Sequence, residues 1–206
     1  MTDLFAPRTP EDVADLVLGH PLAFVVSADL DGPRSTLLPI RPKFGDDGEV
    51  VRLEGHFARR NPQLEAIRRD PRALILFLGP NGYVSPSWFA DRSQAPTWNY
   101  ASVQFLTELE LYEDEPSLTE HLRDLIGANE AGRPGAWSIE ETGERFQRLI
   151  RGIVGFRAAV VEARPKFKLG QDERDDVFAD MMTGLRANGA DALAQWMDRF
   201  ADRPGT

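Results

Sequence analysis

The stretch at residues 79–105, GPNGYVSPSWFADRSQAPTWNYASVQF, governs the interpretation of the whole sequence. A nearly continuous apolar run precedes it and an alternating segment ends it, so it connects two predicted strands. Aromatic faces stack on planar rings, while Ser, Thr and Asn side chains supply neutral hydrogen-bonding partners. One interpretation is therefore a wall of a site for a flat ligand, and the other is a proline-rich core loop and hairpin. Its aromatic residues are Tyr83, Trp88, Phe89, Trp98, Tyr100 and Phe105.

The segments on either side predict a mainly antiparallel sheet. Residues 101–112 alternate, because Ala101, Val103 and Phe105 share one face and polar side chains share the other. Further strands are expected at residues 22–28, 34–40, 49–55, 72–78 and 153–163. Short turns between strands, without a regular strand–helix alternation, favour a barrel or sandwich over a parallel doubly wound sheet. We expect an α+β protein that is mainly β with peripheral helices.

Helices are expected around this sheet and after it. Thr9, Pro10 and two acidic residues are typical of a helix start, and Gly19 precedes the Pro21 that ends this helix. Other helices are predicted at residues 62–69, 116–128, 140–151, 173–187 and 190–200. The simplest division is one domain, residues 1–206, with a barrel over about 1–165. The C-terminal segment and two helices, about 166–206, form an appendage.

The composition excludes several classes of function. The chain has 206 residues and no cysteine, which excludes disulfides, thiolate metal sites and cysteine nucleophiles. Its formal charge of -9 opposes binding to phosphate polymers. No apolar run is long enough to span a bilayer, and the first residues lack the order of a signal peptide, so we expect a cytoplasmic protein without membrane contact. Walker, Rossmann and G-x-S-x-G motifs are absent.

A second candidate region lies at residues 55–62, GHFARRNP. Arg59, Arg60 and Asn61 precede a predicted helix, and free backbone N–H groups beside arginines favour an anion. The alternative is a pair of solvated surface charges. His56 is a candidate axial ligand for haem iron, or a histidine hydrogen-bonded to a loop backbone. No other metal site is predicted, because the histidines lie far apart in the sequence.

These stretches together resemble the PaiB-like "FMN-binding negative transcriptional regulator" family. The resemblance follows the chain in order and implies an antiparallel split β-barrel of the pyridoxamine-phosphate-oxidase and flavin-reductase type. It also implies a homodimer with its ligand at the subunit interface. The segments that carry it are PLA at 21–23, GHFARRNP at 55–62, GP at 79–80, YVSPSW at 83–88, PTWNY at 96–100, VGF at 154–156 and KLGQ at 168–171.

The resemblance also implies site residues. Arg59, Arg60 and Asn61 would hold an anion, and Lys168 and Gln171 would arrive from the C-terminal segment of the same or the partner subunit. The residues expected to face a ring are Ser85, Ser87, Trp88, Thr97, Trp98 and Asn99. Two departures affect the polar groups available to a ligand. Leu37 stands where members of the family often have histidine, and the Lys-Leu-Ser-Gln-Asn pattern has Gly170 and Asp172 here.

Three hypotheses follow for the function. The first is a homodimer that binds FMN non-covalently at its interface and acts as a redox-linked regulator or an oxidoreductase. The second is a haem protein or haem-dependent enzyme with His56 on the iron, because the piperazate synthases, which use haem, resemble this family. The third is a non-catalytic transcriptional regulator, for which the acidic charge makes direct DNA binding the least supported version.

Overall fold

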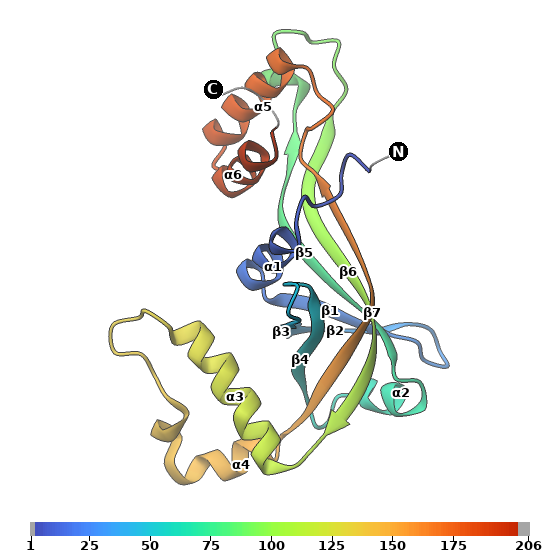
Figure 1. Cartoon of the computed structure of the whole chain (residues 1–206), viewed down its shortest axis with the longest axis vertical. Helices are drawn as coiled ribbons and strands as arrows, with labels where there is room; N and C mark the ends of the chain where they lie inside the picture. The colour runs from blue at the N-terminus through green and yellow to red at the C-terminus, as the bar shows by residue number, and fades with distance from the viewer. Residues whose placement is uncertain (1–2, 202–206) are drawn as a thin grey trace.

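A single seven-stranded antiparallel sheet dominates the computed structural model, which describes residues 3–201 (Figure 1). The strand order is β2-β1-β5-β6-β7-β4-β3, so β2 and β3 are the two edges. No ladder joins these edges among the described residues, and the barrel is therefore split rather than closed. The strands are β1 (Leu22–Ser27), β2 (Arg34–Pro39), β3 (Arg41–Phe44), β4 (Val50–Ala58), β5 (Arg72–Val84), β6 (Thr97–Tyr112) and β7 (Ile153–Lys168).

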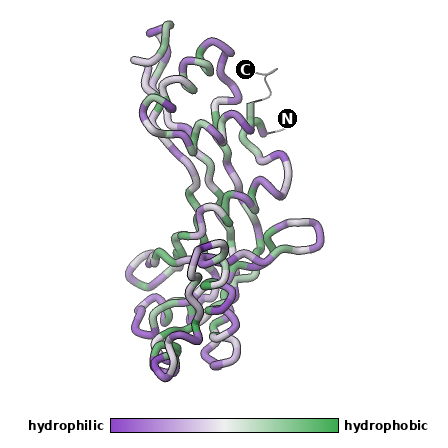
Figure 2. The backbone as a smooth tube through the Cα atoms, turned by 90° about the vertical axis from the view of Figure 1, so that its left-hand side faces the viewer, coloured by the Kyte–Doolittle hydropathy of each residue, from purple (hydrophilic) through white to green (hydrophobic). Residues whose placement is uncertain are grey.

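Three long strands, β5, β6 and β7, give the molecule its elongated shape (Figure 1). At about 3.3 Å per residue, the 16 residues of β6 span about 50 Å. Tyr83 pairs with Trp98 at one end of this ribbon, and Tyr112 pairs with Gly155 at the other. Along the strands hydrophobic and hydrophilic residues alternate, as Figure 2 shows, because successive side chains point to opposite faces.

Helices gather at the two ends of the ribbon and at its middle (Figure 1). The first helix, α1, begins with a capping box in which Thr9 and Asp12 satisfy each other's backbone N–H groups. The helices are α1 (Pro10–Gly19), α2 (Gln63–Arg69), α3 (Glu115–Glu130), α4 (Phe146–Ile150), α5 (Asp175–Ala187) and α6 (Asp191–Phe200), with 3-10 turns η1 (Pro86–Trp88) and η2 (Ile139–Arg145).

One continuous hydrophobic core runs from Leu16 in α1 to Phe200 in α6. Its largest members, with almost no exposed surface, include Phe57, Phe77, Phe105, Phe156 and Phe167 from the sheet. The α5–α6 pair contributes Met181, Leu185, Leu193 and Met197 to this same core. A smaller cluster of Tyr112, Leu118 and Ile150 lies under α3 and α4.

The predicted sheet and the C-terminal helical appendage are confirmed, with differences in extent. The three long strands extend beyond their predicted ends, and a bulge between Leu78 and Asn81 absorbs Gly79 and Pro80 without ending β5. Strand β3 was not predicted, and it contains Pro42, which an edge strand tolerates. The predicted helix at 140–151 is instead η2 and α4, with Gly143 at positive φ. Residues 202–206 of the predicted appendage lie outside the described residues.

Candidate functional site

Two exposed aromatic rings lie at the α5–α6 end of the ribbon. Trp98 and Tyr83 are cross-strand neighbours with ring centroids 6.0 Å apart, and their exposed fractions are 56% and 46%. Lys168 of β7 is the cross-strand neighbour of Tyr100 in β6, and its Nζ donates to Thr97 Oγ1. The structure therefore brings Thr97 and Lys168 of the predicted ligand set into contact, and Trp98 follows Thr97 in β6.

The remaining predicted ring-facing residues have structural partners. Asn99 is buried beneath α6, where its Nδ2 donates to Met197 Sδ at 3.5 Å, because strand alternation turns it away from Trp98. Trp88 packs against Gly184 of α5, so closely that a Cβ there would lie 2.3 Å from the indole ring. Ser85 and Ser87 share a hydrogen bond of 2.7 Å between their hydroxyls at the start of η1.

Gln171 closes its own turn after β7. Its Nε2 donates to Phe167 O at 2.6 Å, and its Oε1 accepts from Leu169 N at 2.7 Å. The amide thus has one donor hydrogen and one lone pair left for any further partner. We infer that its first task is to shape the segment after Lys168.

The predicted anion corner lies between β4 and α2. Arg59 is already engaged, since its guanidinium donates to Arg151 O at 2.6 Å, to Ile153 O at 3.0 Å and to Glu113. Asn61 lies just before α2, and its Oδ1 accepts from Gln63 N, the first residue of that helix, at 2.9 Å. Arg60 is exposed and has no side-chain partner within the part of the chain that the structure describes. It is the one arginine of the pair that is free to meet an anion.

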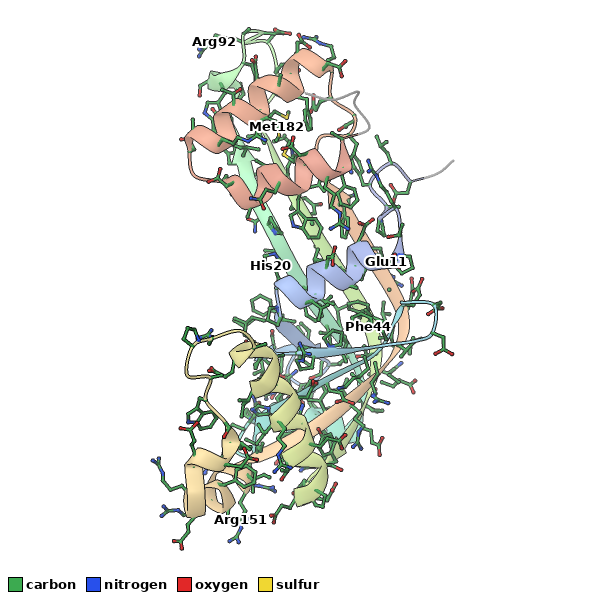
Figure 3. All side chains as sticks on the ribbon, turned by 60° about the vertical axis from the view of Figure 1, so that its left-hand side comes forward. Glu11, His20, Phe44, Arg92, Arg151 and Met182 are labelled. Carbon is green, nitrogen blue, oxygen red and sulfur yellow. The ribbon has the colours of Figure 1, made fainter. Side chains whose placement is uncertain are left out.

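Within one chain, the two predicted groups of site residues are far apart. Arg59 of the first group contacts Arg151, and Arg92 lies in the loop between η1 and β6 that leads to the second group. Figure 3 shows Arg151 and Arg92 at opposite ends of the molecule. From Trp98 to Tyr112, at about 3.3 Å per residue, the separation along β6 is about 45 Å. A single small ligand therefore cannot touch both groups in one subunit.

His56 and His121 form a pair that sequence spacing could not reveal. His56 of β4 and His121 of α3 approach to 3.0 Å between Nδ1 and Nε2, although 65 residues separate them. Burial lowers the pKa of His56, and burial followed by the neighbouring His56 lowers the pKa of His121 to about 4. Both rings are thus neutral near pH 7, and His121 Nδ1 is buried without a partner among the described residues.

His121 borders a polar layer between α3 and the sheet. A cavity of about 440 Å³ lies there, lined by Lys43, Arg52, Glu54, Tyr112, Ser117, Glu120, His121, Asp124 and Arg157. We call the space enclosed by these residues the α3 cavity. Lys43 Nζ lies 2.9 Å from Asp124 Oδ2, and Arg52 Nε lies 2.8 Å from Glu54 Oε1. Burial raises the pKa of Tyr112 to about 12, so its hydroxyl remains protonated.

The sheet face opposite α1 carries exposed apolar side chains. Phe24 pairs with Leu37 on β2 and with Leu76 on β5, and Leu78 continues the same face. Leu22, Phe24, Leu37 and Leu78 are each about half exposed. A cavity of about 520 Å³ on this face is lined by Val26, Leu74, Leu106 and Gln104, among others. We call this surface the open face.

Several of the predicted site residues have the chemistry that a planar anionic cofactor requires, although Trp98 and Arg60 lie at opposite ends of one subunit. Trp98 offers an exposed ring face, and Lys168 and Arg60 offer cations. His56 offers a neutral imidazole, whose Nε2 has no hydrogen-bonding partner among residues 3–201. The structure contains no cluster of three or more His, Asp or Glu side chains suited to a metal within those residues.

An open antiparallel barrel of this topology, with its long ribbon and appended helices, defines a split-barrel protein of the pyridoxamine-phosphate-oxidase type. The chain belongs to the family described as "Putative FMN-binding domain", whose model matches residues 1–162. This confirms the family resemblance seen in the sequence.

Relatives and solved structures agree with this assignment. The chain is 28% identical over 184 residues to the "Protease synthase and sporulation protein PAI 2" of Bacillus subtilis, covering 88% of this chain and 86% of that protein. The flavocytochrome Anf3 of Azotobacter vinelandii has a TM-score of 0.58 at 19% identity, over 84% of this chain and 74% of that one. The FAD and heme binding protein of Mycobacterium smegmatis has a TM-score of 0.58 at 18% identity, over 84% and 78%. These two likenesses concern the fold.

None of the helices described for residues 3–201 combines the length and the apolar character needed to cross a membrane.

Proposed function

We propose that this protein is a homodimer that binds FMN non-covalently at its subunit interface and acts as a redox-linked regulator or an oxidoreductase. The observation that carries the proposal is the open face, where apolar side chains continue towards the exposed Trp98 and Lys168. Proteins that remain monomeric rarely expose a large contiguous apolar patch, so a second copy is the expected occupant. The cofactor would supply the redox chemistry, and the protein would orient it.

A dimer also offers a reason for the distance between the two groups of site residues. Trp98 and Lys168 lie at one end of the ribbon and Arg60 at the other, about 45 Å away. Two sheets packed by their open faces about an axis across the strands would bring the Trp98 end of one subunit over the Arg60 end of its partner. Trp98 would then stack on the isoalloxazine ring while Arg60 or Lys168 binds the phosphate.

Light scattering after gel filtration tests the dimer. Phe24→Glu places a charge within the open face and is expected to yield a monomer. Leu30→Glu is the matched control, because Leu30 is 85% exposed in the turn after β1 and outside this face. A wild-type monomer, or a Phe24→Glu protein that still elutes as a dimer, would refute the proposed interface.

Flavin binding is tested by absorbance and fluorescence titration with FMN, FAD and haemin. We expect saturable FMN binding that weakens at least tenfold in Arg60→Ala and in Trp98→Ala. Arg148→Ala is the control for the lost charge, since Arg148 is exposed on α4 and is not one of the predicted site residues. Unchanged FMN affinity in both test variants would exclude these residues from the site, and no binding of FMN would end the flavin proposal.

A haem protein is the second candidate, and the His56–His121 pair favours it. Metal-ligating histidines commonly hydrogen-bond through the second ring nitrogen, which orients the imidazole. His56 has this arrangement, since Nδ1 contacts His121 at 3.0 Å and Nε2 is left for iron. A Soret band after haemin addition that disappears in His56→Ala would replace the FMN assignment, whereas a band retained in that variant would exclude His56 as the ligand.

A regulator without a redox cofactor is the third candidate. The formal charge of -9 opposes a DNA backbone, so regulation would act through a protein partner unless a local cationic surface contributes. Absence of any chromophore after both titrations would favour this version. A gel shift that saturates on a specific duplex at physiological salt would establish direct DNA binding.

A further inference from the structure

The α3 cavity contains two charged side chains that the protein leaves unpaired. Among its six charged residues, Lys43 pairs with Asp124 at 2.9 Å and with Glu54 at 3.9 Å, and Arg52 pairs with Glu54. Within the described chain, Arg157 and Glu120 make no ion pair. One cation and one anion therefore line the same cavity without an ion-pairing partner among the described residues.

Arg157 is held in a fixed orientation. Its guanidinium carbon lies 4.4 Å from the centroid of the Tyr112 ring, and its Nη2 donates to Ser117 Oγ at 3.3 Å. The Tyr112 ring can lie there because Gly155 has no side chain, since a Cβ at that position would stand 2.3 Å from Tyr112 Cζ. A stacked guanidinium keeps its remaining N–H groups in one plane, which suits a carboxylate.

The opposite wall of the cavity comes from one face of α3. Ser117, Glu120, His121 and Asp124 have the spacing i, i+3, i+4 and i+7, so they project from the same side of the helix. His121 is 3% exposed, and its Nδ1 has no partner among the described residues. In one tautomer this atom is a donor and in the other an acceptor, so a buried polar group is left unsatisfied either way.

We propose that the α3 cavity binds a free amino acid, with its carboxylate on Arg157 and its ammonium group on Glu120. The cavity volume of about 440 Å³ lies within the usual range of about 300–1,000 Å³ for small-molecule sites. The predominantly polar lining suits a zwitterion with a short or polar side chain. This site is separate from the open face and does not depend on the flavin proposal.

The first experiment measures the melting temperature of the full-length protein with each of the twenty standard L-amino acids. When a ligand is present at a hundred times its Kd, it is expected to raise the melting temperature of a protein of this length by about 5–10 °C. Each amino acid that stabilises is then compared with its deamino analogue, its decarboxylated analogue and inorganic phosphate. We expect the complete zwitterion to bind at least tenfold more tightly than any of these three.

Two variants separate the two contacts. Arg157→Gln is expected to weaken binding of the amino acid and of its deamino analogue at least tenfold. Glu120→Gln is expected to weaken only the amino acid, because the deamino analogue has no ammonium group. Arg148→Gln and Glu144→Gln make the same exchanges at exposed residues outside the cavity and should leave binding unchanged. If Arg157→Gln unfolds, Arg157→Lys keeps the charge and should weaken binding by a smaller factor.

The outcomes that overturn the proposal are distinct. No stabilisation by any amino acid would exclude the site. Equal binding of phosphate, with no effect of Glu120→Gln, would define an anion site rather than a zwitterion site. Unchanged binding in both cavity variants would place the amino acid elsewhere. FMN titration of Glu120→Gln gives an independent readout, because its flavin affinity should equal that of the wild type.

Discussion

Replacing Gly184 with alanine tests whether Trp88 is a structural residue or a ligand-facing one. An alanine Cβ at position 184 would lie 2.3 Å from Trp88 Cδ2 and Cε3, so the indole or helix α5 must move. Alanine is preferred over glycine in a helix interior by about 1 kcal/mol, which favours the variant. Overpacking of this kind costs about 1–3 kcal/mol, so we expect a net loss of up to about 2 kcal/mol.

Gly127→Ala is the matched control for this substitution. Gly127 also lies within a helix, but a Cβ there meets no atom within 4 Å, so only the propensity gain of about 1 kcal/mol remains. The free energies of unfolding of the two variants should therefore differ by about 1–3 kcal/mol in urea titrations followed by circular dichroism. If Gly184→Ala is stabilised as much as Gly127→Ala, α5 does not pack on Trp88, and the indole is available to a ligand.

Two further predictions concern buried polar groups. His121 has a pKa of about 4 in the folded protein against an ordinary value of 6.5, so its contribution to stability is complete above pH 6.5 and is lost as the pH falls towards 4. The loss amounts to at most about 3 kcal/mol of unfolding free energy. Urea titrations at pH 7.5 and pH 5 should show a smaller drop in unfolding free energy for His121→Gln than for the wild type. An equal drop in both proteins would exclude this ring as the cause. Gln63 Nε2 donates to Val25 O at 2.9 Å, and Gln63 Oε1 accepts from Thr36 Oγ1 at 2.6 Å. Gln63→Leu should therefore lower the unfolding free energy by about 2–4 kcal/mol, because both partners lose a buried hydrogen bond. A loss below about 1 kcal/mol in the same titration would show that water replaces the amide.

The sheet was predictable because its strands have strong local patterns. In residues 101–112 a strict alternation marks the buried face, and β6 has that alternation. Strand ends were less predictable, since Gly79 and Pro80 are turn residues in most contexts and are accommodated here by a bulge. Strand β3 was missed because Pro42 is compatible only with an edge, and edge position is a property of the whole sheet.

The candidate site was predictable only in part, for a similar reason. Trp98 and Asn99 are adjacent in sequence, but strand alternation exposes the first and buries the second beneath α6. The sequence motif alone does not show which of its residues lie on the exposed face of a strand and which lie on the buried face. That assignment requires the secondary structure. The pairing of His56 with His121 depends on how α3 packs on the sheet, which no local pattern specifies.

The packing of α3 indicates that its charged face serves a purpose other than stability. The apolar residue Leu118 packs with Tyr112 and Ile150 in the small cluster beside α4, and the polar side of the helix faces the sheet. A helix normally gains stability by burying apolar surface against a sheet, at about 25 cal/mol per Å². Leu118 and Leu125 supply part of that gain, but the polar side of α3 faces ion pairs whose desolvation opposes their attraction, as for Glu54, which is only 8% exposed. Hydrophobic residues in the same positions would pack α3 more favourably, so stability alone does not account for the buried His121 and the half-buried Arg157, and the proposed amino-acid site does.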